Sequence, residues 1–139
     1  MIIQPAPPEH FQYLVDRAGV FPSPVFSAIE AVDATGAVHG MFGYDGWTDN
    51  AVVMHMALDN PACLRHLLHP AFLYPFAQLN LGIALCAIRG DNLRSLRLAE
   101  RMGFREVYRI KNCYGGGTDQ MIYEMRREEC RWLQQRKAA

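Results

Sequence analysis

Three polar side chains in this sequence lie where acid–base chemistry can be expected. His55 lies in the apolar stretch AVVMHMALD, Glu30 in VFSAIEAV, and Ser95 in RGDNLRSLRLAERMGF. An imidazole or a carboxylate can accept a proton near neutral pH, and a hydroxyl can donate one to a leaving group. Each residue also has a structural interpretation, because a strand histidine can simply fill space and a helix serine can be a surface hydroxyl.

A second group of residues suggests metal binding. Cys63, His66 and His69 follow one another at intervals of three residues. Side chains three apart on a helix can share a ligand, but three in succession fan around the helix, and no fourth ligand is evident. We therefore expect no metal. The glycines at 115–117 lack the Lys-Ser/Thr of a phosphate-binding loop and indicate a flexible hairpin loop.

The composition is that of an ordinary globular protein. The 139 residues suit one domain, residues 1–139, since most domains have roughly 100–150 residues. Hydrophobic residues make up 50% of the chain, and 14 basic residues balance 14 acidic ones. A neutral chain has no net field to attract nucleic acid or an anionic membrane. The positive charge is local, with arginines at 89, 94, 97, 101 and 105 that form either an anion-binding edge or a solvated helix face.

The cysteines and the hydropathy predict a cytoplasmic protein. The four cysteines are scattered without a CxxC pair, and Cys86 lies inside an apolar run, which favours reduced thiols. The first residues lack the basic and apolar regions of a signal peptide. No stretch approaches the ~20 apolar residues of a membrane span, so we expect no membrane contact.

The elements that position the polar residues are predicted to alternate between strands and helices. Residues 1–24 are an abbreviated, proline-rich segment with one short helix at 9–17. Residues 25–32 and 37–44 flank the turn DATG as a hairpin, and residues 51–59 form a third strand. Asn60 then caps a helix that prolines at 70 and 75 must kink or divide.

The second half of the chain continues this α/β order. Residues 83–88 form an apolar strand of the kind covered on both faces. Asp91 or Asn92 caps the next helix, and Gly103 ends it. Two more strands, at 104–110 and 119–126, and an amphipathic helix at 127–137 complete the prediction.

The spacing of Asn92, Ser95, Leu98, Gly103 and Phe104 resembles a known motif. In the GCN5-related N-acetyltransferase (GNAT) superfamily, a strand is followed by Asn-x-x-Ser/Ala-x-x-Leu and then Gly-Phe. The resemblance covers about residues 25–126 and extends to short phage and prophage members. It implies an α/β (α+β) fold with a twisted mixed sheet, mostly antiparallel, flanked by helices. One parallel pair, AVVMHMALD with IALCAI, would be splayed to admit acetyl-CoA.

The resemblance also implies a function and a set of site residues. The function is acetyl transfer from acetyl-CoA to an amine of unknown identity, on a small molecule or a peptide, by direct attack in a ternary complex. Ser95 would donate to the departing sulfur, since the tyrosine that many relatives use is replaced by Ala99. His55 and Glu30 are the candidate bases. The implied cofactor contacts are Leu58, Ala62, Cys63, Leu64, Arg65, Asn92 and Arg97.

The loop after the third strand departs from the family pattern. Relatives hold the cofactor diphosphate there with a glycine-rich Gln/Arg-x-x-Gly-x-Gly/Ala loop, whereas this chain has Asp59 followed by NPACL. Pro61 contributes no donor, and the Asp59 carboxylate would cost about 1 kcal/mol beside a phosphate. Cofactor binding is therefore expected to be weakened or rearranged. The amides at 62–64 and Arg65 still favour an anion.

Two other functional classes stay open. The fold can persist without catalysis as a binding or assembly module, which the altered loop and the absent tyrosine favour. The arginine edge can contact nucleic acid, although the neutral charge opposes this. A homodimer is compatible with Trp132 and Leu133 on the last predicted helix, and packing of that helix on the core explains the same residues.

Overall fold

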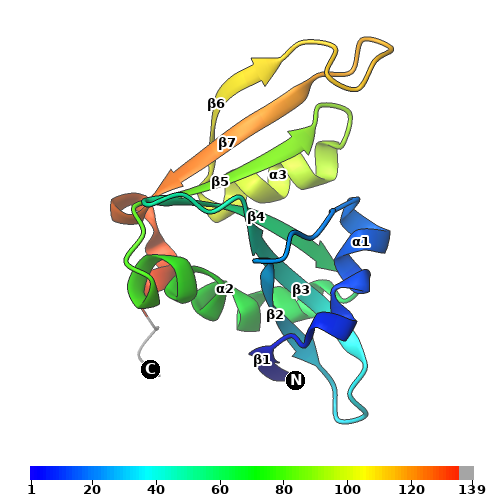
Figure 1. Cartoon of the computed structure of the whole chain (residues 1–139), viewed down its shortest axis with the longest axis vertical. Helices are drawn as coiled ribbons and strands as arrows, with labels where there is room; N and C mark the ends of the chain where they lie inside the picture. The colour runs from blue at the N-terminus through cyan, green and yellow to red at the C-terminus, as the bar shows by residue number, and fades with distance from the viewer. Residues whose placement is uncertain (135–139) are drawn as a thin grey trace.

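A computed structural model describes residues 1–134 of the chain. Its centre is a seven-stranded mixed sheet in the order β1-β2-β3-β4-β5-β7-β6 (Figure 1). The strands are β1 (Ile2–Pro5), β2 (Ser27–Val32), β3 (Val38–Asp45), β4 (Ala51–Leu58), β5 (Ile83–Arg89), β6 (Arg105–Ile110) and β7 (Gln120–Arg126). The α/β fold class and the mixed, mostly antiparallel sheet predicted from the sequence are confirmed.

Three α-helices and several short helical turns connect the strands. The α-helices are α1 (Gln12–Ala18), α2 (Leu64–Leu73) and α3 (Leu93–Met102). The short turns are η1 (Pro8–His10), η2 (Pro61–Cys63), η3 (Tyr74–Gln78), η4 (Arg127–Glu129) and η5 (Arg131–Leu133). Among residues 1–134, no helix combines the length and the hydropathy needed to cross a membrane.

The parallel pair β4–β5 is joined only at its beginning. Residues 51–53 of β4 pair with residues 83–85 of β5, and every other neighbouring pair in the sheet is antiparallel. Beyond this point β4 continues to Leu58 and β5 to Arg89 without pairing to each other. Figure 1 shows β5, β7 and β6 directed away from the first four strands. The predicted splay is therefore confirmed.

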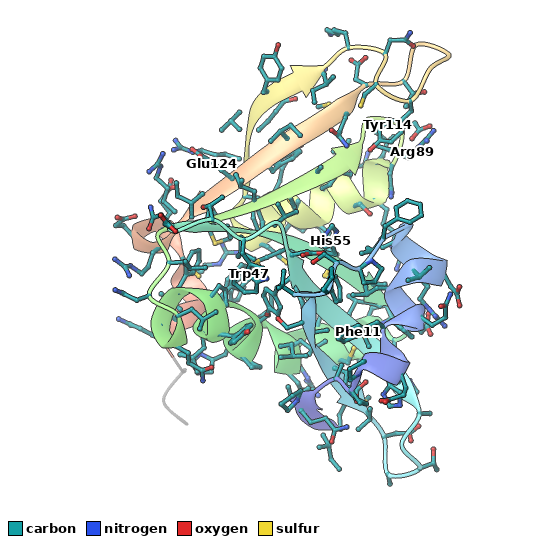
Figure 2. All side chains as sticks on the ribbon, viewed as in Figure 1. Phe11, Trp47, His55, Arg89, Tyr114 and Glu124 are labelled. Atoms are coloured by element: carbon teal, nitrogen blue, oxygen red, sulfur yellow. The ribbon has the colours of Figure 1, made fainter. Side chains whose placement is uncertain are left out.

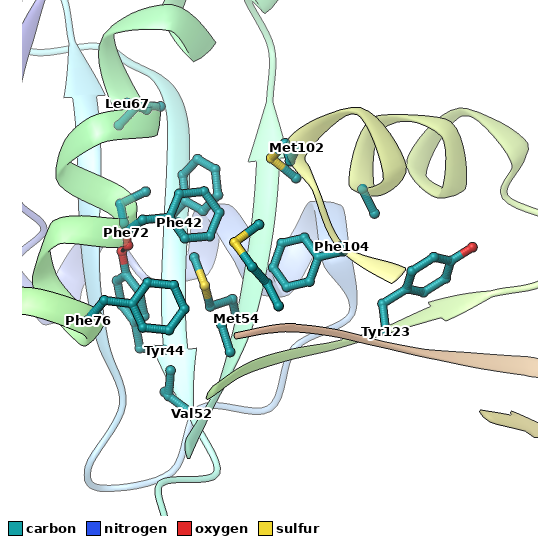
Figure 3. Packing of buried hydrophobic residues seen from close by; sticks show 14 of the residues in the cluster. Phe42, Tyr44, Val52, Met54, Leu67, Phe72, Phe76, Met102, Phe104 and Tyr123 are labelled. Carbon is teal, nitrogen blue, oxygen red and sulfur yellow. Dashed lines mark hydrogen bonds between the residues drawn. The ribbon is translucent and has the colours of Figure 1, made fainter. Parts of the chain in front are cut away.

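The larger core lies between the sheet and the helices α2 and α3. Phe42 of β3 packs edge-on against Phe72 of α2, which also contacts Phe104 at the end of α3 (Figure 3). These three rings are each at most 4% exposed, so the two helices share one apolar layer. Burial at this level contributes roughly 1.5–3 kcal/mol for each large apolar side chain.

The other face of the sheet carries a smaller core under α1. Leu14 of α1 is fully buried and packs with Phe26 and Met41. Gly43 of β3 permits this contact, because a Cβ there would lie 2.4 Å from the Phe26 ring and 2.6 Å from Leu14. The site described below lies between these two cores.

Helices α2 and α3 follow the local sequence signals closely. The Asn60 side chain accepts from the Ala62 amide at 3.0 Å, and the Asn92 side chain accepts from the Ser95 amide at 3.2 Å. Gly103 ends α3 with φ of 111°, a conformation that favours glycine. Pro70 stays within α2, and the chain passes into the π-helical turn η3 at the second proline, as predicted for a divided helix.

The ends of the chain differ from the prediction. Strand β1 was not expected, and the predicted closing helix is wrong over residues 127–134, where the chain forms η4 and η5. The Trp132 indole donates to the Met102 carbonyl at 2.7 Å, and the His69 ring meets the Trp132 carbonyl at 2.8 Å. These contacts hold the segment against α2 and α3 in a non-helical path. Residues 135–137 of the predicted helix lie outside the described residues.

Strand β5 is also less covered than predicted. Ala84 is fully buried, whereas Ala87 is exposed and Cys86 is only partly buried. The first half of β5 pairs with both β4 and β7, whereas its second half pairs only with β7. The second half therefore has one unpaired edge, which borders the gap.

Candidate active site

A pocket of about 530 Å³ occupies the gap between β4 and β5. Its walls come from the C-terminal end of α1, the middle of β4, the second half of β5 and the inner face of α3. Because β4 and β5 do not pair here, the pocket reaches both faces of the sheet. Side chains of the larger core therefore share one space with His55 and with the end of α1.

The alternation of side chains along β4 and β5 gives the pocket two sides. Met54 and Met56 point into the core under α2 and α3, and so do Cys86 and Ile88 on the other wall. His55 points to the opposite face, where its ring stacks on Phe26 with centroids 6.3 Å apart. We call these the α3 side and the α1 side.

The α3 side presents the start of helix α3 to the pocket. Asn92 and Ser95 both line the pocket, and the Asn92 oxygen accepts from the Ser95 amide at 3.2 Å. This cap uses only the oxygen of Asn92, so its NH₂ group is left to donate elsewhere. Ala99, 2% exposed, lies one turn further along the same wall. The Ser95 hydroxyl is thus the proton donor that α3 offers to the pocket.

The α1 side contains an imidazole that is suited to accept a proton. Burial lowers the pKa of His55 below its usual value of 6.5, and the nearby Asp45 carboxylate partly opposes this shift. Asp45 itself is fixed by Ser23, whose hydroxyl and amide donate to it at 2.6 and 3.0 Å. His55 is therefore neutral at pH 7 and able to act as a base.

Two arginines stand at the mouth of the pocket. Arg17 at the end of α1 donates to both oxygens of Asp59 at 2.8 and 2.9 Å. Arg89 at the end of β5 donates to both oxygens of Asp91 at 3.1 Å, and its guanidinium lies 4.5 Å from the ring centre of Tyr114. Figure 2 shows Arg89 and Tyr114 together near the tip of β5, with His55 nearer the middle of the molecule.

The loop that would hold a diphosphate by resemblance has its amides engaged. The Ala62 amide donates to the Asn60 side chain and the Cys63 amide to the Asn60 carbonyl, both at 3.0 Å. The Leu64 amide donates to the Pro61 carbonyl. The Asp59 amide also has internal acceptors. In this conformation the loop offers no free amide between residues 59 and 64.

The structure brings some of the predicted site residues together and separates others. Ser95, His55 and Asn92 share the pocket. Glu30 does not line it: this carboxylate is fully buried in β2 and accepts from Gln4 and meets the His10 ring, each at 2.8 Å. The predicted cofactor contacts that also lie outside the pocket lining are Leu58, Ala62, Cys63, Leu64, Arg65 and Arg97.

The Cys63, His66 and His69 run does not form a cluster. Cys63 is buried with its sulfur 3.6 Å from the His39 carbonyl, and His69 contacts the C-terminal segment. Within residues 1–134, no three His, Cys, Asp or Glu side chains lie close enough together to hold a metal ion.

The pocket residues that were not identified from the sequence include Arg17, Gly19 and Tyr114. Helix α1, which Gly19 caps, contacts β4, and the Tyr114 ring faces the Arg89 guanidinium at the end of β5. Arg17 lies in a helix of the proline-rich segment, and Tyr114 lies in the glycine-rich loop, so no local pattern distinguished them. Arg89 had been predicted only as part of an arginine edge.

The comparisons with known proteins rest on structure. No protein-family model and no curated protein sequence matches the chain. Spermidine N-acetyltransferase from Vibrio cholerae in complex with CoA and spermine superposes with a TM-score of 0.75 at 12% identity, covering 96% of this chain and 98% of that one. The chain has the GNAT fold. A second structure, the spermidine/spermine N-acetyltransferase SpeG of Vibrio cholerae with manganese ions, gives a TM-score of 0.74 at 12% identity over 91% and 92% of the two chains.

Within the GNAT fold, the gap between β4 and β5 and the helix start at Asn92 are the features that the sequence motif anticipated. The motif residues Asn92, Ser95 and Phe104 all line the pocket. The motif residues thus lie beside the stretch where β4 and β5 do not pair.

Proposed function

We propose that this protein is an acetyl-CoA-dependent N-acetyltransferase that transfers acetyl to an amine by direct attack in a ternary complex. The observation that carries the proposal is that one pocket passes through the sheet with Asn92 and Ser95 on one side and His55 on the other. A thioester on the α3 side and an amine on the α1 side would meet inside it. The structural neighbour crystallised with CoA and spermine supports a small-molecule amine as acceptor, and a peptide amine fits the same chemistry.

The chemistry needs one base and one acid. The amine nitrogen attacks the thioester carbonyl, a C–N bond forms, and the C–S bond breaks with its electron pair on sulfur. His55 takes the proton that the amine loses, and Ser95 donates to the departing thiolate. A thiolate of pKa ~8–9 is a tolerable leaving group, so the proton donor is the smaller of the two contributions.

The pocket fits the pantetheine arm of acetyl-CoA better than the diphosphate. The free NH₂ of Asn92 can donate to an amide carbonyl of the arm, and the Ser95 hydroxyl lies one turn away. The amides at 59–64 are engaged, so we propose that phosphates are held by side chains, namely Arg65 beside that loop and Arg17 once its ion pair with Asp59 opens. This arrangement predicts weak cofactor binding.

Isothermal titration calorimetry with acetyl-CoA, followed by an acetylation assay over an amine panel, tests this function. We expect saturable heat and release of free CoA that depends on an amine. Ser95→Ala should lower kcat by about 100-fold with little change in acetyl-CoA affinity, as for loss of a general acid. An unchanged kcat in that variant would leave Ser95 as a helix-surface hydroxyl.

The engaged loop favours one alternative function. A chain of this fold that cannot hold the diphosphate would serve as a binding or assembly module without turnover. The absence of any heat and any thermal shift at millimolar acetyl-CoA would support the module and exclude the enzyme.

The cellular setting is also a proposal. We propose a cytoplasmic location, supported by four cysteines that are all free thiols in the described structure. The placement among short phage-like proteins and the homodimer stay predictions.

A further inference from the structure

The charges around the α1 side of the pocket identify the class of acceptor. Among the residues that the structure describes, the charged side chains lining the pocket are Arg17 and Arg89, and no carboxylate lines it. The nearest acids already have partners: Asp59 pairs with Arg17, Asp91 pairs with Arg89, and Asp45, near His55, accepts from the hydroxyl and amide of Ser23. A polyamine carries several ammonium groups that need acidic partners. This pocket offers none.

The two arginines differ in what they leave available. All three nitrogens of Arg17 are used, two by Asp59 and the third by the Tyr13 carbonyl at 3.2 Å. Arg89 uses only Nε and Nη2 for Asp91, and within residues 1–134 its Nη1 has no hydrogen-bond partner. Arg89 is therefore the guanidinium that can bind a further anion.

Arg89 also lies on the side from which an acceptor amine would come. In the ladder between β5 and β7, Arg89 pairs with Gln120, so its side chain lies on the face opposite the one that Cys86 and Ile88 present to α3. Tyr114 supports this position, because its ring faces the Arg89 guanidinium and its hydroxyl accepts from Gln120 at 3.0 Å. Figure 2 shows Arg89 and Tyr114 beside each other and His55 nearer the middle of the molecule, and all three residues line the pocket.

We propose that the acceptor is a monoamine that carries an oxyanion, a carboxylate or a phosphate, which Arg89 binds while the amine faces His55. The inference rests on the proposed acetyltransferase function and names its substrate class. It separates this chain from the neighbour whose structure contains spermine. Arginine suits the role because its planar fork can serve Asp91 and a ligand oxyanion together.

The test compares acceptors that differ only in the anion. The pairs are phenylalanine and phenethylamine, leucine and isopentylamine, and phosphoethanolamine and ethanolamine, with spermidine as the polycation. For at least one pair we expect kcat/KM of the anionic member to be higher by about 10- to 100-fold, the range of a charge-assisted hydrogen bond. The first two pairs against the third distinguish carboxylate from phosphate.

Variants of Arg89 assign the preference to this side chain. Arg89→Gln should bring the ratio within each pair close to one, and Arg89→Lys should restore part of it. Arg126→Gln is the matched control, because Arg126 is 50% exposed against 49% for Arg89 and lies outside the pocket. Thermal melts of the variants show that each is folded.

The outcomes separate this inference from the function beneath it. If spermidine or the decarboxylated amines are acetylated as efficiently as the anionic members, the inference is wrong and the acetyltransferase function stands. The same holds if Arg89→Gln lowers kcat/KM equally for both members of every pair. If the wild-type chain gives no heat with acetyl-CoA, the proposed function fails, and the inference fails with it.

Discussion

The Arg17 guanidinium and the Asp59 carboxylate form a bidentate ion pair that joins the end of α1 to the loop before α2, with N–O distances of 2.8 and 2.9 Å. Asp59 is the acid that the sequence predicts beside the cofactor diphosphate, and this pair holds the Arg17 cation against it. The expected repulsion is therefore largely cancelled as long as the pair is intact.

Asp59→Asn is predicted to tighten acetyl-CoA binding. The change removes the negative charge and leaves Arg17 free for a phosphate. The binding free energy of acetyl-CoA should improve by about 1 kcal/mol, which corresponds to a roughly fivefold lower Kd. Stability should fall by less than about 1 kcal/mol, because both side chains are partly exposed. Calorimetry at two salt concentrations measures the effect, with exposed Asp49→Asn as the control. An unchanged Kd in Asp59→Asn means that the phosphates bind elsewhere.

The pH dependence of His55 provides a second prediction. Burial lowers its pKa below 6.5 and Asp45 raises it, so Asp45→Asn should move the titration to still lower pH. Because the pKa is lower in the folded than in the unfolded chain, the unfolded chain binds more protons below about pH 6.5. The stability that His55 contributes is thus complete above that pH and decreases as the pH falls through the folded-state pKa.

NMR titration of the ring protons measures this directly, with the His55 signal assigned from its loss in His55→Gln. Between pH 7 and 5, the free energy of unfolding of His55→Gln should depend less on pH than that of the wild type, because the contribution of His55 is lost. A His55 pKa at or above 6.5 in the wild-type chain contradicts the prediction.

Features of this fold that depend on adjacent residues could be predicted from the sequence, whereas features that depend on distant contacts could not. Asn92 and Gly103 mark the ends of α3 because caps depend on a few adjacent residues, and the prediction from sequence was right there. Strand β1 was missed because four residues ending in proline carry no strand pattern, and only pairing with β2 creates the strand. The C-terminal helix failed because contacts of Trp132 with Met102 and His69 override an amphipathic pattern.

The same distinction between local and distant contacts applies to the candidate site. Ser95, His55 and Asn92 were placed by strand and helix position, and the structure gathers them in one pocket. Glu30 has the same local appearance as His55, but Gln4 and His10 reach it from a segment whose path the sequence does not specify. The sequence likewise does not show that the loop amides at 59–64 donate to acceptors within the protein, because this depends on how the loop folds.

Glu30→Gln is predicted to affect stability and leave catalysis intact. The carboxylate is fully buried and accepts from Gln4 while it contacts the His10 ring, so loss of its charge should cost about 1–3 kcal/mol. Glu30 lies outside the pocket, so kcat should stay within about threefold of wild type, since a lost general base costs 100-fold or more. Urea unfolding and steady-state kinetics measure the two effects, with exposed Glu9→Gln as the control.

Trp132 provides a prediction about assembly. Its indole donates to the Met102 carbonyl at 2.7 Å and its ring packs on the larger core, so it serves the fold of its own chain. Trp132→Ala should lower the free energy of unfolding by about 2 kcal/mol, less than for a fully buried tryptophan. Sedimentation velocity should give the same oligomeric state for the variant and the wild type. A dimer that dissociates in Trp132→Ala would instead place this residue at an interface between copies.

Two substitutions at Asn92 separate its structural role from its proposed contact with the cofactor. Asn92→Asp keeps an oxygen that accepts from the Ser95 amide, and it adds negative charge at a helix N-terminus, so stability should be unchanged or higher. It removes the NH₂ donor, and we expect the Kd for acetyl-CoA to rise about tenfold, the effect of one lost hydrogen bond. Asn92→Ala removes both functions and should also cost about 1 kcal/mol of stability. If Asn92→Asp binds acetyl-CoA as tightly as the wild type, then Asn92 is a helix cap alone, because its oxygen is the only group that both chains share.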